Sequence, residues 1–298
     1  MKNTIRAPLS VLIFIMALIM ANSVFAQTEA DFLVDLTADG TGVVITGFTG
    51  NQRQVRIPAT IQGFPVREIG ERAFSPREWS EITSVTIPAG VVKIGAGAFS
   101  ECQSLTTVSI PASVTIIEYG AFGNCEKLTT INFPEGLIEI GTNAFFGCHA
   151  LRTVRLPNSL IKLGEDAFSM SNHGQNAGIQ TLTIGTGLTE IPNRAFSGNS
   201  FTTIVIPQNI TKIGVHAFAN CDRLATVTIN STVLEIMTLA FHGCAALTTI
   251  NIPAALESIT WTDSNGNPQP ESLAFAGCPR IALATRAVLQ RLGYRGSY

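Results

Sequence analysis

The 298-residue sequence carries little charge. Only 13% of its residues are Asp, Glu, Lys or Arg, the formal net charge is −2, and no run of Lys or Arg occurs. A protein that binds nucleic acid needs a basic stripe to neutralise phosphates, and one that binds an anionic bilayer needs a basic face. We therefore expect no nucleic-acid partner and no charge-driven attachment to a membrane.

The sequence also lacks a catalytic constellation. Its four histidines, His149, His173, His216 and His242, fall at unequal positions of the repeat described below, without a Ser/His/Asp or paired-carboxylate spacing. General acid–base and nucleophilic catalysis need such groups within hydrogen-bond reach of one another. We therefore expect no enzyme, no catalytic residues and no cofactor.

No apolar run reaches the roughly 20 residues that a membrane-spanning helix needs. The apolar run at residues 9–20 follows Lys2 and Arg6, and it precedes Val24 and Ala26 at positions −3 and −1 of a cleavage site. This pattern predicts a signal peptide at residues 1–26. Residue 27 is not Cys, so no lipid anchor is expected, and we expect export to the periplasm, the cell surface or the medium without membrane insertion.

What the sequence has in abundance is a repeat. Residues 98–120 (AFSECQSLTTVSIPASVTIIEYG), 121–143 (AFGNCEKLTTINFPEGLIEIGTN) and 144–166 (AFFGCHALRTVRLPNSLIKLGED) align without a gap. A repeat of fixed length predicts a solenoid, in which each coil packs only on its neighbours. The chain is therefore expected to form one elongated domain.

Two markers trace about nine coils through residues 51–280. The first is the Phe of an Ala-Phe pair: Phe74, Phe99, Phe122, Phe145, Phe168, Phe196, Phe218, Phe241 and Phe275. The second is the apolar residue that ends a strand, usually before Pro: Ile57, Ile87, Ile110, Phe133, Leu156, Ile184, Ile206, Ile229 and Ile252.

Each coil contains two apolar segments with different spacing. The L-x-x-V-x-I segment alternates apolar and polar residues, which predicts one strand per coil, paired in parallel with its neighbours. Proline then ends the strand because it cannot donate to the ladder. The V-x-x-I-G segment returns apolar side chains from the opposite wall and allows a short second strand. The repeat Phe is expected between these walls, stacked on the Phe above and below.

The ends of the stack need covers, because an open solenoid exposes its core. Residues 27–50 hold two apolar-rich runs around Gly40 and Gly42, which predicts a capping hairpin. Residues 281–298 place Leu283, Val288, Leu289 and Leu292 at nearly helical spacing, which predicts a short helical cap.

Two insertions break the period, at residues 169–180 and 261–272. Insertions in solenoids map to surface loops. Asp263, Asn265 and Asn267 alternate as calcium ligands can, but no closing Glu stands at the right distance. A solvated turn is favoured, and no metal site is expected.

Six cysteines in an exported protein ordinarily predict three disulfides. Here each lies three residues after its repeat Phe: Cys102, Cys125, Cys148, Cys221, Cys244 and Cys278. Parallel Cα–Cβ vectors in successive coils keep the Cβ atoms wider apart than the roughly 3.8 Å of a disulfide. Ser171 and Asn199 replace Cys in two coils, which indicates a column of small side chains that bond to turn backbone groups. We predict six buried free thiols.

Charge alternates along another repeat position, five residues past the strand-ending one. The residues there are Glu139, Lys162, Glu190, Lys212 and Glu235. Opposite charges on neighbouring strands attract, and a slip by one coil would bring like charges together. We interpret this row as a device that holds the register.

The outward residues of the main strands form a largely neutral, hydroxyl-rich face. They are Thr107, Ser109, Thr130, Asn132, Thr153, Arg155, Thr181, Thr183, Thr203, Val205, Thr226, Thr228, Thr249 and Asn251. Threonine favours strands, so this can be an ordinary soluble sheet surface. Solenoids also use extended sheet faces for recognition. Both interpretations stay open, and all of these residues except Ser109 and Val205 are candidate ligand-binding residues.

The repeat unit C-x-x-L-T-x-V-x-I-P-x-x-V-x-x-I-G-x-x-A-F, with the opening coil IPATIQGFPVREIGERAF at 57–74, closely resembles the BspA-like, treponemal-type leucine-rich repeat. The resemblance covers residues 51–280. It implies a right-handed, β-rich horseshoe solenoid with a parallel sheet on its concave side. Glu118, Met237 and Thr260 replace the glycine of the pattern, and Asn230 replaces its proline.

The resemblance also implies an exported bacterial protein associated with adhesion to host matrix, host cells or other bacteria, and it brings no shared catalytic residues. Our leading hypothesis is a non-enzymatic binding and adhesion protein that presents the threonine-rich face to a protein or glycan. The alternatives are an envelope enzyme, a structural scaffold and, more remotely, an ice-binding lattice, which Arg155 and the asparagines interrupt.

Overall fold

The computed structural model describes residues 27–75, 81–170, 177–230, 232–253, 256, 261–262, 268–269, 273–292, 294 and 296–298. The predicted signal peptide lies outside the described residues. The same holds for much of both insertions, with Ser171, His173, Asp263, Asn265 and Asn267, and for Thr260.

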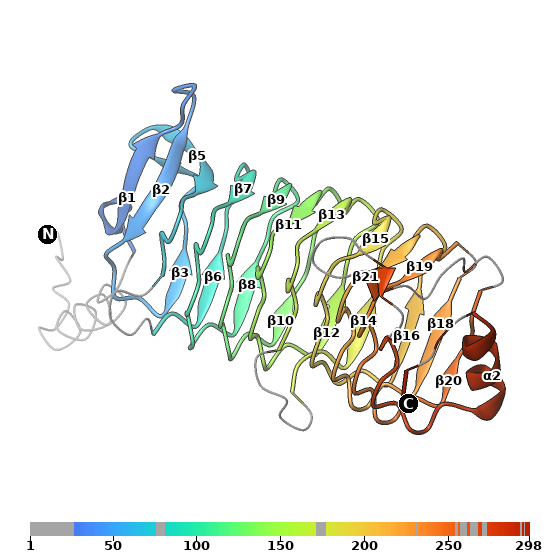
Figure 1. Cartoon of the computed structure of the whole chain (residues 1–298). Helices are drawn as coiled ribbons and strands as arrows, with labels where there is room; N and C mark the ends of the chain where they lie inside the picture. The colour runs from blue at the N-terminus through green and yellow to red at the C-terminus, as the bar shows by residue number, and fades with distance from the viewer. Residues whose placement is uncertain are drawn as a thin grey trace, which may run out of the picture.

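The chain forms a β-solenoid of about nine turns, as the sequence predicts (Figure 1). One strand per coil makes up what we call the first-strand row, drawn along the lower side of Figure 1. Its strands are β3 (Gln54–Arg56), β6 (Ser84–Thr86), β8 (Thr107–Ser109), β10 (Thr130–Ile131), β12 (Thr153–Arg155), β14 (Thr181–Thr183), β16 (Thr203–Ile206), β18 (Thr226–Ile229) and β20 (Thr249–Ile250). The pairs within this row are parallel, and in each strand the central apolar residue is buried.

The short second strand is present in most coils and forms the second-strand row, along the upper side of Figure 1. Its members are β5 (Phe64–Ile69), β7 (Lys93–Ile94), β9 (Ile116–Ile117), β11 (Glu139–Ile140), β13 (Lys162–Leu163), β15 (Glu190–Ile191), β17 (Lys212–Ile213) and β19 (Glu235–Ile236). These strands also pair in parallel. Each coil therefore has two walls.

The Ala-Phe pairs lie on arcs that close the third side of each coil. The backbone N–H of Phe99 donates to the carbonyl of Ala121 at 2.7 Å, and that of Phe122 donates to the carbonyl of Ala144 at 2.8 Å. The same bond recurs from Phe74 to Phe241. The pair thus forms a third inter-coil ladder, which the strand pattern of the sequence did not predict.

The repeat phenylalanines stack into one buried column, as predicted. From Phe74 to Phe275, neighbouring ring centroids lie 4.9–5.8 Å apart with interplanar angles of 4–16°. Phe48 continues the column at one end and Tyr294 at the other. The aromatic core therefore runs through both caps.

From the arc of Phe74 to that of Phe241, each arc bends sharply through a residue in the left-handed region, two positions before the repeat Phe. The residues of this left-handed column have φ of 51–58° and are Arg72, Gly97, Gly120, Asn143, Asp166, Arg194, His216 and Leu239. This conformation costs free energy for every residue other than glycine, because the Cβ atom lies too close to the following carbonyl oxygen. The mixture of residue types explains why no sequence pattern marks the bend.

All six cysteines are free and buried, which confirms the prediction. Each thiol donates a hydrogen bond to the carbonyl of the repeat Phe in the preceding coil, as Cys125 Sγ does to Phe99 O at 3.1 Å. The other five are Cys102, Cys148, Cys221, Cys244 and Cys278, at 3.1–3.4 Å. Asn199, which replaces Cys in its coil, donates through Nδ2 to Phe168 O at 2.9 Å. The column satisfies turn carbonyls, as its composition indicates.

The charged row lies on the second-strand row, with its residues in cross-strand register. Glu139 and Lys162 form an ion pair at 2.6 Å. Lys212 is the register neighbour of both Glu190 and Glu235. The predicted alternation of charge therefore falls on one face.

Both ends carry the expected elements. After the short helix η1 (Glu29–Asp31), β1 (Phe32–Leu36) and β2 (Val43–Phe48) form an antiparallel hairpin, and β2 extends the second-strand row by pairing with β5. Strand β4 (Thr60–Ile61) also pairs with β5. Strands β21 (Trp261–Thr262) and β22 (Pro268–Gln269) pair within the second insertion.

The C-terminal helix α2 spans Leu283–Arg291 at the far end of the stack (Figure 1). Its packing differs from the helical pattern predicted: Leu289 is buried, but Leu283 is 82% exposed. Leu283 is the first residue of the helix, whereas Leu289 and Leu292, at its C-terminal end, pack on the core. Tyr294 fills the end of the core instead, edge-on to Phe275.

Removing one ring tests the aromatic column. Phe145→Ala is expected to lower the free energy of unfolding by about 3–5 kcal/mol, because the ring is fully buried between Phe122 and Phe168. Phe146→Ala is the matched control, since it removes the same ring from a half-buried position outside the column. Guanidinium unfolding followed by circular dichroism measures both, and equal losses would contradict the role of the column.

The thiol column predicts a loss of stability at alkaline pH. Burial raises the pKa of Cys148 and of Cys221 to about 12, whereas the thiols of the unfolded chain ionise near 9. The unfolded state therefore gains thiolate first, and stability falls as the pH rises above 9. Between pH 8 and pH 10, Cys148→Ser should lose about 1–2 kcal/mol less than wild type, because serine does not titrate there. Parallel losses, measured by urea unfolding, would refute this.

Candidate functional site

The predicted binding face is the outward side of the first-strand row. The first outward residue of the strand is Thr in seven consecutive coils. These residues align in what we call the threonine column, which consists of Thr107, Thr130, Thr153, Thr181, Thr203, Thr226 and Thr249. Thr226 is half-buried and the other six are exposed. The structure therefore brings these predicted residues together on one row over seven consecutive coils.

The two adjacent threonines of the L-T-T segment have different environments. The hydroxyl of the first donates to a carbonyl of the preceding coil, as Thr106 does to Thr83 O at 2.9 Å and Thr129 does to Thr106 O at 3.2 Å. In the threonine column, by contrast, the only hydroxyl contact recorded within the described residues is Thr249 with Thr248 at 3.5 Å. The hydroxyl of the first threonine is thus bonded to the backbone of the preceding coil, and the hydroxyl of the second can bond to solvent or to a partner. The sequence did not reveal this division.

The neighbouring outward column has a mixed composition. It contains Ser109, Asn132, Arg155, Thr183, Val205, Thr228 and Asn251, all exposed. Arg155 is its one charged member and lies in register with Thr183. This column varies in chemistry from coil to coil while the threonine column stays constant.

Asn251 has a structural role within that column. Its Oδ1 accepts from the N–H of Ile229 at 2.6 Å, and its Nδ2 donates to the carbonyl of the same residue at 2.7 Å. The amide therefore continues the ladder beyond the end of β20. Of the twelve predicted site residues, Asn251 is the one whose side chain is already committed to the backbone of a neighbouring coil.

The histidines that sequence reasoning separated are partly brought together. His216 lies near His242 and Arg194, and its pKa is lowered, first by burial and then by these two charges, while Asp166 opposes the shift. Arg194 is itself held by Asp166, Nε to Oδ2 at 2.8 Å. The described residues contain no group of three or more His, Cys, Asp or Glu that could hold a metal ion.

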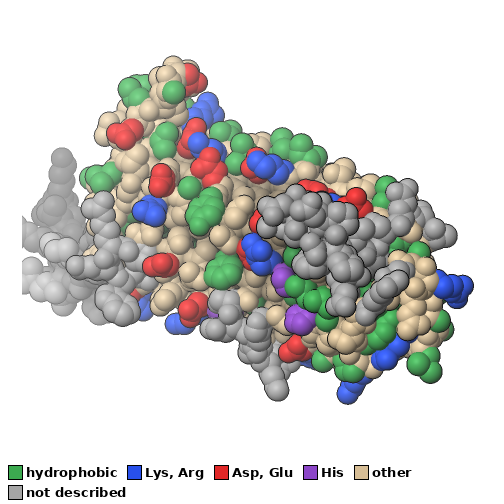
Figure 2. Space-filling view, viewed as in Figure 1, with side chains coloured by type: hydrophobic (Ala, Val, Ile, Leu, Met, Phe, Trp, Pro, Cys, Tyr) green, Lys and Arg blue, Asp and Glu red, His purple; other side chains and the backbone are tan. Residues whose placement is uncertain are grey.

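Figure 2 shows acidic and basic side chains interspersed over the face that it displays. Within the described part of the chain, no helix has the length and apolar character needed to cross a membrane.

The architecture defines the class of protein. Its coils are built on a leucine-rich apolar unit and stack through two rows of parallel strands, which makes the protein a leucine-rich repeat solenoid. The family described as the BspA type leucine-rich repeat region matches residues 67–179 and 173–262, in 6 copies. These matches span more than half of the chain, so the protein belongs to the BspA-type leucine-rich repeat family. The resemblance seen in the repeat unit is confirmed.

Solved structures show the same fold. A leucine-rich repeat protein of T. pallidum is 23% identical, with 91% of this chain and 97% of that one covered and a TM-score of 0.56. One from Bacteroides ovatus is 20% identical, with 86% and 93% covered and a TM-score of 0.50. The pneumococcal vaccine antigen PcpA is 20% identical, with 84% and 78% covered and a TM-score of 0.50. Among curated proteins, none matches the chain.

The structural role of Asn251 can be tested against Asn132, which stands at the same repeat position five coils earlier. Asn251→Ala should lower the free energy of unfolding by about 1–2 kcal/mol, because it leaves the N–H and C=O of Ile229 without their partner. Asn132→Ala removes the same amide from an exposed position of the same column and should change stability by less than about 0.5 kcal/mol. Chemical denaturation of both variants decides, and similar effects would refute the assignment.

Proposed function

We propose that the protein is an exported, non-enzymatic binding and adhesion module that presents the threonine column and its mixed neighbour to a partner. The observation that carries the proposal is the threonine column itself. Its exposed hydroxyls lie at one repeat position on a rigid strand row, and they are not consumed by the fold. Strand propensity explains the choice of threonine, but it does not require the same hydroxyl to stay free of bonds to the backbone over seven consecutive coils.

The shape of this face favours a macromolecular partner. Strands in a sheet lie about 4.8 Å apart, so seven coils extend the column over roughly 29 Å. A stable interface buries about 800 Å² on each partner, which a face of this length can supply. The face is broad and almost uncharged, and we favour a protein of the host matrix, the host cell surface or another bacterium, with a glycan chain as the other partner class.

Export and exposure to a host have indirect support. The first 26 residues have the composition of a signal peptide. A protein of similar fold, PcpA, is described as a pneumococcal vaccine antigen. A partner outside the cell is consistent with both.

Binding to immobilised matrix proteins tests the face. Thr153→Glu/Arg155→Glu places two carboxylates at the exposed positions of β12 on either side of buried Val154 and should weaken binding at least tenfold. Thr189→Glu/Arg291→Glu is the control, since it makes the same changes at exposed positions outside the first-strand row and should bind as wild type does.

Circular dichroism of both variants establishes that the fold is intact. If the two variants bind equally well, this face is not the binding surface. If wild type binds no matrix protein, adhesion to matrix is wrong.

A further inference from the structure

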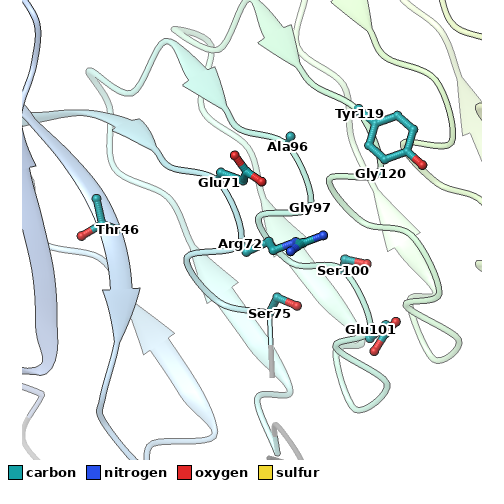
Figure 3. Close-up of a pocket in the computed structure, with 10 residues that line it drawn as sticks. All are labelled: Thr46, Glu71, Arg72, Ser75, Ala96, Gly97, Ser100, Glu101, Tyr119 and Gly120. Carbon is teal, nitrogen blue, oxygen red and sulfur yellow. The ribbon is translucent and has the colours of Figure 1, made fainter. Parts of the chain in front are cut away.

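A hollow lies on the arc side of the first coils, away from the first-strand row. Its volume is 640 Å³, within the range of about 300–1,000 Å³ that is usual for ligand sites. Figure 3 shows the lining, which comes from the arcs of three successive coils and from β2. The hollow is therefore distinct from the threonine column.

The hollow exists because two coils lack a side chain where other coils have one. Gly97 and Gly120 occupy the left-handed column, in which later coils carry Asn143, Asp166 and Arg194. No atom lies within 4 Å of the place where a Cβ on Gly120 would stand. Because the bend accommodates larger residues elsewhere, the backbone does not by itself demand glycine at both positions. Their effect is to leave open space.

The member of the same column before these glycines is Arg72, and it supplies a cation. Figure 3 shows its side chain extending past Gly97 towards Ser100. A Cβ on Gly97 would lie 3.3 Å from Arg72 Cγ, so the glycine also makes room for this side chain. Within the described residues, no ion pair or side-chain hydrogen bond of the Arg72 guanidinium is recorded. Its donors are available to a ligand.

The other lining groups are an exposed ring and polar side chains of both kinds. Tyr119 is 61% exposed, and in Figure 3 it lies on the opposite side of Gly97 from Arg72. Glu71 and Glu101 line the same hollow as Arg72 without an ion pair to it. The hydroxyl of Ser75 also lines it, whereas the hydroxyl of Ser100 donates to Gly123 O at 3.4 Å. An exposed aromatic ring next to unpaired donors and acceptors suits a ligand with one apolar face and several polar groups.

The chemistry of the lining selects a class of ligand. Two carboxylates and one guanidinium give a formal charge of −1, which disfavours an anion. The dominance of polar groups disfavours an apolar ligand or peptide side chain. Sugar hydroxyls both donate and accept, so they can pair with Arg72 and with the carboxylates, while the C–H face of the ring packs on Tyr119. We propose that this hollow binds a neutral saccharide unit.

The test fills the hollow without disturbing the bend. Gly120→Asn adds a side chain to the open space, and Asn143 already adopts φ of 56° at the same position of the next coil, so the fold should be retained. Binding is measured on an array of neutral and acidic oligosaccharides and of peptides, and then by titration with the strongest neutral oligosaccharide. Wild type should bind neutral saccharides, and Gly120→Asn should bind them at least tenfold more weakly.

Further variants keep the outcome clear. Tyr119→Ala removes an exposed ring, so it should have little effect on stability, and it should also reduce binding tenfold or more. It tests the same hollow even if Gly120→Asn does not fold. Thr153→Glu/Arg155→Glu should bind the saccharide as wild type does, so the two surfaces can fail independently.

Three results would overturn the proposal. They are a wild-type protein that binds no neutral saccharide on the array, binding to acidic saccharides or peptides alone, and variants of Gly120 and Tyr119 that bind as tightly as wild type.

Discussion

The stack depends on the repeat phenylalanine, because three of its groups contact neighbouring coils. In Phe122, for example, the ring stacks on Phe99 and Phe145, the N–H donates to Ala144, and the carbonyl accepts from the thiol of Cys148. The first contact sets the spacing of the coils, and the two hydrogen bonds set their register. A solenoid has only nearest-neighbour contacts, so a constraint repeated in every coil determines the whole shape.

Asn251 apart, this arrangement leaves the outward side chains of the first-strand row without a bond that the fold needs. Register is already held on the arc side and, on the second-strand row, by charge pairs such as Glu139 with Lys162. The column that contains Asn132, Arg155 and Thr183 changes its chemistry from coil to coil. A surface whose side chains are mostly not needed by the fold is suited to recognition, and function on such a fold is then determined by these side chains.

The sequence predicted the repeated parts of the fold because identical positions carry identical chemistry. The Phe column, the free thiols and the two strand rows all follow from residues that recur at one spacing, such as Cys102, Cys125 and Cys148. The left-handed bends could not be predicted, because the conformation is shared by Arg72, Gly120 and Asp166, which have no property in common. The pairing of Asn251 with Ile229 was equally hidden, since it depends on where one strand ends relative to its neighbour.

The hollow shows why departures from a repeat deserve as much weight as the repeat. A pattern search treats Gly97 and Gly120 as neutral variation, because glycine is common near turns. When one coil is compared with the next, Gly97 and Gly120 are the two members of the left-handed column that have no side chain. They lie next to the exposed ring of Tyr119. In a solenoid, each coil provides the reference for the next, so the space that a missing side chain leaves can be located residue by residue. Such space is where a repetitive scaffold can acquire a ligand site without altering its core.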